Sequence, residues 1–506
     1  EGLLRFRHDR VQQAAYGPLS QARREELHLA IARRLARQPE FAPLAADQYL
    51  PAAASMREPA ERRAAARLLH DAAAVRFGLT NYAAAERFLA GAIALLGEAQ
   101  TPADRKLLAL LATGQHAALY SMGRLDEADR LYRSIEHHCA TPVDLVEAAC
   151  VQVSSLTNRG RPRDALALGL GLLRKLGIVV PAADAMSAEV SRELDAFYQW
   201  VSDATRAGAD RRAPATDASI VAVAALINRL MPAARLCDPT VVAWLVLESQ
   251  RLWAAHGPCS KLAACLGHAT LVTIATRDDY RSGYQAVGHV LATCEALGWL
   301  PEAAQVRDLF ALSTSHWFEP LERSVALVRE AREGLLRQGD LQGTCFADYI
   351  SITALLDCAP NLDLYAGEIE AALAFARRTG NAHGTDLYLV HRQLLRLLRG
   401  RTMAPGSLSD GDFDELQREQ RLGANPSADA TFHLVRTVAA VLTGDMAALV
   451  REAQALVALR SYLQSFYATA LLHLLHAMAQ AQRLKDAAPH ARPALLAELN
   501  ASCQWL

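Results

Sequence analysis

The chain has 506 residues, far more than the roughly 100–200 of one domain, so it holds several domains or one extended repeat array. Its 53 basic and 54 acidic residues nearly cancel, which argues against a nucleic-acid partner and against an acidic disordered tail. Hydrophobic residues make up 52% and aromatic residues only 6%, so the apolar content is largely Leu and Ala, which favour helices.

The 9 cysteines are scattered singly without a CxxC pair, which is typical of free thiols in a reducing compartment. No signal peptide is recognisable, and the chain begins with Glu1 rather than Met, so we expect a fragment or a processed product. The apolar run at residues 220–227 is shorter than the roughly 18 residues of a membrane span. We therefore expect a soluble, cytoplasmic protein without a membrane span.

Helix-start signals recur along the first 180 residues. Ser20 is an expected N-cap for a helix to about residue 38, and a short apolar helix is predicted over 47–55. Pro59 opens a long helix. Thr101 and Thr141 each precede a proline and stand three residues before an aspartate, which predicts two further helix starts.

A repeat signature lies within these helices. Gly123, Leu125, Ala128 and Tyr132 fit the second helix of a tetratricopeptide repeat. In that helix a small Ala lies where two helices approach, and a large residue fills the next groove. Similar alanines occur 43 residues earlier and 37 residues later, against an ideal period of about 34, which indicates degenerate repeats.

The remaining chain continues as predicted helices after an interruption. Residues 181–216 break the rhythm with a longer helix and then a polar loop. Helices are then predicted over 239–255, 261–276, 280–297, 301–316, 320–337, 341–358 and 362–378, with a loop at 400–412 and a final group from 413 to 499.

One stretch near the start has the composition of a site. His8 and Asp9 lie between a short apolar segment and an expected helix that runs through Gln12 to Tyr16. Considered as residues alone, Asp9 is the N-cap of that helix. A functional role for His8 is the alternative.

Residues 6–16 and 23–28 resemble a recurrent stretch of large bacterial signal-transduction ATPases. These proteins combine an AAA-type nucleotide domain, a winged helix and a helical-repeat region. Residues 277–284, 315–317 and 407–415 are similar to the repeat region of multi-domain proteins that join a serine/threonine kinase-like region, such an ATPase, a GAF domain and a sensor histidine kinase.

The resemblance implies a nucleotide link outside this chain. No GxxxxGK[ST] motif occurs, so the ATP- and ADP-binding domain would precede residue 1. By analogy His8 would contact bound ADP and Asp9 would orient it. No histidine-kinase phosphoacceptor motif follows residue 480, so that domain would lie beyond residue 506. We expect no cofactor bound by this chain alone.

These inferences give an all-α fold: an α-solenoid of degenerate tetratricopeptide-like helical hairpins, with the tail of a winged-helix domain at the N-terminus. The predicted domains are the end of the winged helix with linking helices (1–50), a first array (51–180), an irregular connector (181–216), a second array (217–400) and a C-terminal helical group (401–506).

Aromatic residues gather in the middle array. Trp244, Trp253, Tyr280, Tyr284 and Trp317 either pack between helix pairs or line a concave groove for a peptide or effector. We favour packing, because that is the commoner role of such residues.

Metal sites are not expected. Cys259, Cys265 and His268 lack a fourth ligand at zinc spacing, and His473 with His476 has no acidic or thiol partner on the adjoining turn. The alternating acids of residues 410–414 lack the Gly and the final Glu of a calcium loop, so an N-capped loop is the better interpretation.

The preferred function is regulatory. We expect the sensor arm of a signal-transduction ATPase or sensor kinase, which binds a protein or small effector and is coupled in cis to the upstream ATPase domain. The alternative is a stand-alone tetratricopeptide-like interaction scaffold. An enzyme with its site in these residues is the least favoured class, because no nucleophile–base or metal constellation stands out.

Overall fold

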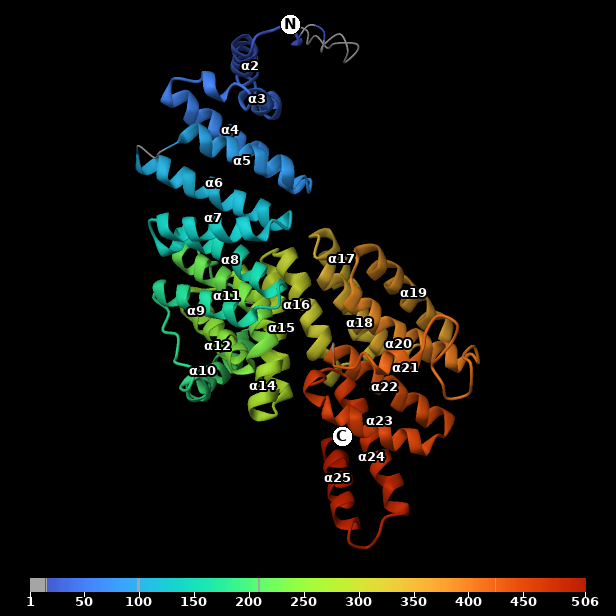
Figure 1. Ribbon diagram of the computed structural model, residues 1–506. Helices are drawn as coiled ribbons and strands as arrows, with labels where there is room; N and C mark the ends of the chain where they lie inside the picture. The colour runs from blue at the N-terminus through green and yellow to red at the C-terminus, as the bar shows by residue number, and fades with distance from the viewer. Residues whose placement is uncertain (1–13, 15, 98–100, 208–209, 424) are drawn as a thin grey trace. The chain divides into compact units, whose positions relative to one another are not determined.

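The computed structural model describes residues 14, 16–97, 101–207, 210–423 and 425–506, and these residues form helices joined by turns, with no strand among them (Figure 1). The prediction of an all-α fold is confirmed, and successive packed helices are what a helical-repeat protein requires. The chain forms two compact units. Unit 1 comprises residues 1–182 and 217–239, and unit 2 comprises residues 183–216 and 240–506.

In unit 1 most helices pack against the next helix in the chain (Figure 1). The helical segments of unit 1 are α2 (Gln21–Leu35), η1 (Pro39–Phe41), α3 (Ala42–Tyr49), η2 (Ala53–Ser55), α4 (Pro59–Gly78), α5 (Tyr82–Leu96), α6 (Pro102–Ser121), α7 (Leu125–His138), α8 (Pro142–Asn158), α9 (Pro162–Lys175) and α11 (Ala218–Cys237).

The predicted helix starts are confirmed where the sequence offers a capping side chain. The hydroxyl of Thr101 accepts from the backbone N–H of Asp104 at 3.1 Å, and Asp104 returns a bond to the Thr101 N–H. Thr141 caps α8 in the same way, at 3.3 Å from the N–H of Asp144. Each cap satisfies a donor that the first helical turn leaves free.

The small alanines of the repeat signature are fully buried. Ala85, Ala128 and Ala165 are all 0% exposed. Gly123 has φ +73° in the turn between α6 and α7, a conformation that costs a residue with a Cβ more than it costs glycine. The local sequence thus accounts for the turn and for a buried small residue in this hairpin.

The predicted second array begins at residue 217, whereas the structure places α11, which begins at Ala218, in unit 1. This helix packs on α8 and α9, so residues 217–239 belong with unit 1. A Cβ on Gly169 would lie 2.4 Å from a methyl carbon of Leu230. The glycine therefore lets α11 approach α9, a contact between residues 61 apart in the numbering that local patterns do not reveal.

The same α11 is the one described helix long and apolar enough to cross a membrane by length and composition, with a mean hydropathy of 1.6 over its most apolar window. It contains Arg229, Pro232 and Arg235, which interrupt the apolar sequence after the run at 220–227. Packing on α8 and α9 accounts for much of its apolar surface.

Unit 2 continues the helical pattern with more irregular turns. Its helical segments are α10 (Met186–Ala207), α12 (Pro239–His256, from Thr240 on), α13 (Ser260–Leu266), α14 (Ala269–Arg277), α15 (Tyr280–Ala296), α16 (Leu300–Ser313), η3 (Ser315–Trp317), α17 (Leu321–Arg337), α18 (Leu341–Cys358), α19 (Leu362–Thr379), α20 (Ala382–Leu398), α21 (Glu415–Glu419), α22 (Pro426–Thr443), α23 (Met446–Ala458), η4 (Arg460–Tyr462), α24 (Ala468–Lys485) and α25 (Arg492–Trp505).

Three predicted helices are corrected, and the one expected over 301–316 ends as α16 at Ser313, before η3. The helix expected over 261–276 is divided into α13 and α14. At the division, Nδ1 of His268 lies 3.0 Å from the carbonyl oxygen of Ala264, and the backbone N–H of His268 donates to the carbonyl of Cys265. The helix expected over 47–55 begins at Ala42 and ends at Tyr49. Leu50 still has helical backbone dihedrals, but Pro51 has no backbone N–H to donate to the preceding turn, so the helix ends there.

Candidate functional site

The predicted nucleotide-sensing pair, His8 and Asp9, lies outside the described residues, as does most of the predicted winged-helix tail. Tyr16, the last residue of the resembling stretch 6–16, is described by the structure. Its hydroxyl lies 2.8 Å from Nε2 of His28. Nδ1 of the same His28 lies 2.7 Å from Oε1 of Gln48. The contact of Tyr16 with α2 therefore links the opening segment to the first hairpin.

Two of the five predicted groove residues are interior residues. Trp244 is 3% exposed and Trp253 is 0% exposed, both on α12. The indole N–H of Trp253 donates to Oδ2 of Asp210 at 3.1 Å. For these two side chains, packing is the observed role, and they are not available to a partner.

The other three aromatic residues lie together around the end of α16. The rings of Tyr280 and Trp317 meet edge to face, with centroids 4.9 Å apart. Tyr284 packs 4.9 Å from Phe318 and donates its hydroxyl to Oε1 of Glu319 at 2.6 Å. These contacts gather side chains from α15 and from the turn that follows α16.

The C-terminal hairpin adds to this cluster. The ring of Trp505 lies 5.9 Å from Trp317, and it stacks on His473 at 4.0 Å. Burial lowers the pKa of His473, and the nearby His476 lowers it further. Sequence reasoning did not include Trp505, because nothing in the local pattern indicates that α25 reaches the turn after α16.

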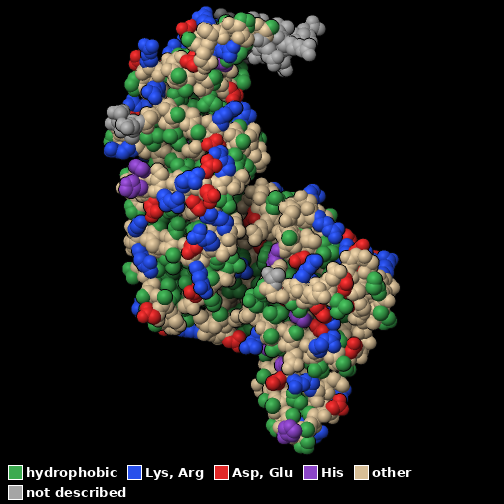
Figure 2. All heavy atoms as spheres, viewed as in Figure 1, with side chains coloured by type: hydrophobic (Ala, Val, Ile, Leu, Met, Phe, Trp, Pro, Cys, Tyr) green, Lys and Arg blue, Asp and Glu red, His purple; other side chains and the backbone are tan. Residues whose placement is uncertain are grey.

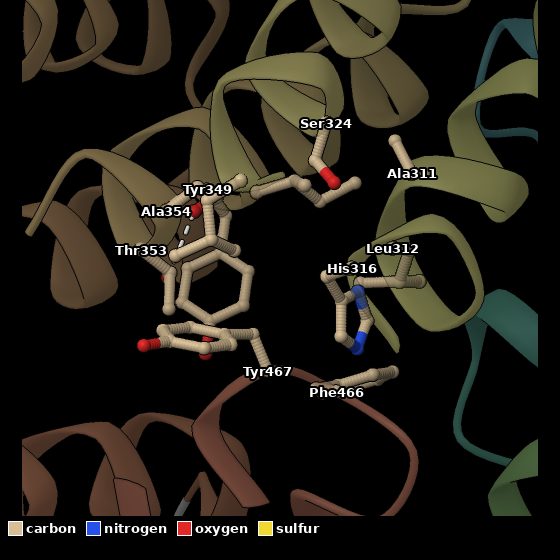
Figure 3. A pocket seen from close by; sticks show the side chains of 11 residues that line it. Ala311, Leu312, His316, Ser324, Tyr349, Thr353, Ala354, Phe466 and Tyr467 are labelled. Carbon is tan, nitrogen blue, oxygen red and sulfur yellow. Dashed lines mark hydrogen bonds between the residues drawn. The ribbon is translucent and has the colours of Figure 1, made fainter. Parts of the chain in front are cut away.

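Next to this cluster the structure has a small hollow, which we call the His316 hollow (Figure 3). Its lining comes from α16, η3, α17, α18 and the segment that precedes α24. The lining residues are Ala311, Leu312, His316, Leu321, Ser324, Tyr349, Ile350, Thr353, Ala354, Phe466 and Tyr467. The space has room for about one water molecule as it stands.

The turn that carries His316 is held by buried hydroxyl groups. The Oγ1 atoms of Thr270 and Thr314 lie 2.7 Å apart, and so do the Oγ atoms of Ser315 and Ser324. These bonds fix a connection between α16 and α17 that contains η3 and does not continue the α-helix. The imidazole therefore borders the hollow opposite Tyr349 and Tyr467 instead of continuing the helix (Figure 3).

The imidazole of His316 is neutral at pH 7. Burial lowers its pKa to about 4, against an upward contribution from backbone groups of Ala311 and Ser465. Backbone groups of Ala311 and Ser465 lie near the ring, but no described group forms a hydrogen bond of good geometry with Nε2, which is shielded from solvent. A buried polar atom without a partner is costly, so it is a natural attachment point for a water molecule or a ligand.

One wall of the hollow is a short connection, residues 463–467, which we call the strap. Ser465 in the strap is buried, with φ +66°, a left-handed conformation that costs a non-glycine residue about 1–3 kcal/mol. Tyr467 donates its hydroxyl to Asp357 at the end of α18. The strap is thus a strained segment fastened by a hydrogen bond at the surface.

A second hollow lies beside Tyr349, lined by Gln342, Cys345, Phe346, Asn381, His383, Gly384, Leu387 and Tyr388. The thiol of Cys345, the imidazole of His383 and the amide of Asn381 are side-chain types that can form a site with a cysteine nucleophile. Burial raises the pKa of Cys345, however, and His383 lies 2.8 Å from the side-chain nitrogen of Asn425 through its Nδ1. Asn381 caps α20. Each group thus has a structural role, and the thiolate is disfavoured.

No described group of three or more His, Cys, Asp or Glu side chains is arranged to hold a metal ion. In the loop at 410–414, Asp410 accepts from the N–H groups of Asp412 and Phe413 at 2.8 and 2.9 Å. Asp414 caps α21. The interpretation of this loop as a capped turn is confirmed.

The visible charge distribution is mixed. On the face shown in Figure 2, basic and acidic side chains of the described residues are interspersed over both units. Such a face lacks the continuous basic stripe that nucleic-acid binding uses.

No family model matches the sequence, and no curated protein is significantly similar to it. His316 was noticed in the sequence only as part of a resembling segment, and Phe466 with Tyr467 gave no signal, since about 150 residues separate them from the turn they cover.

Proposed function

We propose that this chain is the sensor arm of a bacterial signal-transduction ATPase or multi-domain sensor kinase and acts in the cytoplasm. It binds a protein or small effector on its helical repeats and passes that state to a nucleotide-binding module joined to its N-terminal side. The described residues carry out no reaction of their own in this proposal.

The observation that carries the proposal is the run of helical hairpins from α4 to α9, with the fully buried residues Ala85, Ala128 and Ala165. This packing supports degenerate tetratricopeptide-like repeats. Because each hairpin packs mainly on its neighbours, a repeat array offers a long surface to partners.

The link to a nucleotide rests on the resemblance of residues 6–16. In this proposal His8 contacts ADP in the upstream module and Asp9 orients its ring. The hydrogen bond between Tyr16 and His28 then connects that segment with the arm. A stand-alone interaction scaffold is the competing proposal, since it needs no such segment.

The first test is the coding sequence upstream of Glu1. We expect an open reading frame that contains a GxxxxGK[ST] motif followed by a winged-helix domain. A stop codon directly upstream contradicts the ATPase link and favours the scaffold.

The second test uses the full-length protein. We expect His8→Ala to shorten the retention of bound ADP, measured by nucleotide release after purification. His137→Ala, at an exposed position near the end of α7, is the matched control and should leave retention unchanged. Equal retention in wild type and His8→Ala rejects the sensing role.

A further inference from the structure

We propose that the His316 hollow is an effector site for a small uncharged molecule with a flat apolar body and one polar group that hydrogen-bonds to Nε2 of His316. This inference rests on the proposed function in one respect: it names the kind of effector that the sensor arm binds.

The lining excludes a charged ligand. It contains no Asp, Glu, Lys or Arg side chain. Its single imidazole is neutral at pH 7, because burial keeps the pKa of His316 near 4. A charged group placed here would lose its hydration and gain no counter-charge, which is strongly unfavourable.

The lining also limits the ligand to about one polar group. The hydroxyl of Thr353 donates to the carbonyl of Tyr349 at 2.9 Å, and the hydroxyl of Ser324 is paired with Ser315 at 2.7 Å. Tyr467 is paired with Asp357. Among the lining side chains, Nε2 of His316 is left as the buried polar atom without a partner.

The shape of the hollow favours a ring. The rings of Tyr349 and Tyr467 form one side, and His316 lies across the space with Ala311 and Leu312 (Figure 3). Such opposed flat surfaces suit a planar aromatic body, which gains both burial and ring–ring contacts.

A ligand larger than water needs more space, and the strap can provide it. Phe466 and Tyr467 both belong to this short connection. Its fastening to Asp357 is an exposed hydrogen bond that water can replace, and the left-handed Ser465 makes the closed form strained. Outward movement of these two rings, with loss of the hydrogen bond between Tyr467 and Asp357, enlarges the hollow.

The experiment is a binding titration of the purified chain with phenol and indole, followed through tryptophan fluorescence for phenol and by calorimetry for both. Trp317 is a suitable reporter because its ring lies 4.5 Å from that of His316. Benzoate is the charged probe. We expect saturable binding of phenol or indole and at least tenfold weaker binding of benzoate.

Matched variants assign the binding to this hollow. We expect His316→Leu to weaken phenol binding about tenfold, the value of one hydrogen bond to a buried polar atom. Thr353→Val removes a lining hydroxyl that is already paired and should change the affinity less than twofold. Ala354→Phe fills the space and should abolish binding; if that variant does not fold by circular dichroism, the first two decide.

Two results overturn the proposal. One is the absence of saturable phenol and indole binding, which means that the hollow holds only water. The other is binding that His316→Leu leaves unchanged. Either failure leaves the upstream ATPase test untouched, and a stop codon before Glu1 leaves this binding experiment valid, so the two proposals fail separately.

Discussion

Two regions of unit 2 each contain a histidine with a lowered pKa, but the two rings are packed differently. In the regular hairpin of α19 and α20, His391 is 0% exposed, and its Nδ1 lies 2.7 Å from the hydroxyl of Tyr365. In the irregular turn after α16, His316 borders a hollow. Burial lowers the pKa of both to about 4, and both leave Nε2 without a partner.

The difference lies in what surrounds the ring. His391 lies beside a hydrophobic cluster that includes Tyr365, Leu387 and Leu395, and it is not among the lining of either described hollow. His316 has space on one side and a strained strap next to it. A low pKa and an unpaired nitrogen are therefore not enough to indicate a binding site. The histidine must also border a space that a ligand can occupy.

The largest expected effect is on pH dependence, and it tests what the two histidines share. Between pH 6.5 and 4 the unfolded chain binds protons that the folded chain excludes from both rings, so the free energy of unfolding falls as the pH falls. Each histidine accounts for up to about 3 kcal/mol of this loss. We expect His391→Asn and His316→Asn each to reduce the loss in urea unfolding at pH 7.5 and 5. Equal stability of the wild type at both pH values contradicts this account.

The next effect separates the two rings. His391→Ala leaves a cavity and an unpaired Tyr365 hydroxyl, so we expect it to lower the free energy of unfolding by about 3 kcal/mol. His316→Ala enlarges a space that already exists and should cost about 1 kcal/mol. Urea unfolding followed by circular dichroism measures both. Equal costs would show that His316 is packed as tightly as His391.

A smaller effect compares the hydroxyl groups next to each ring. Tyr365→Phe leaves Nδ1 of His391 buried without a partner and should cost about 1–3 kcal/mol. Tyr467→Phe removes the exposed bond to Asp357 and should cost less than about 1 kcal/mol. We expect the second change to speed amide hydrogen exchange in residues 463–467, measured by mass spectrometry. Unchanged exchange there means that this bond does not fasten the strap.

Most of the fold was readable from local sequence. The helix starts at Thr101 and Thr141 were predictable, because the capping hydroxyl and the following proline both lie within the first helical turn. The place of α11 was not readable, since it depends on the contact of Gly169 with Leu230 across the unit. The division of the helix at Gly267 and His268 was not predicted, although a glycine is a common local signal for a helix end.

The site was less predictable than the fold. The sequence drew attention to Trp253, which is interior, and to Trp317, which does lie beside the hollow. It gave no reason to join His316 to Tyr467, since tertiary packing alone brings them together. His8 stays a prediction that rests on resemblance.

The most direct test of the difference between the two histidines is a nitrogen-15 NMR spectrum of the chain labelled at histidine, recorded with and without phenol. His316→Asn and His391→Asn assign the two ring signals. We predict that saturating phenol shifts the Nε2 signal of His316 and leaves that of His391 in place. A spectrum in which neither signal moves, or in which both move equally, contradicts the account.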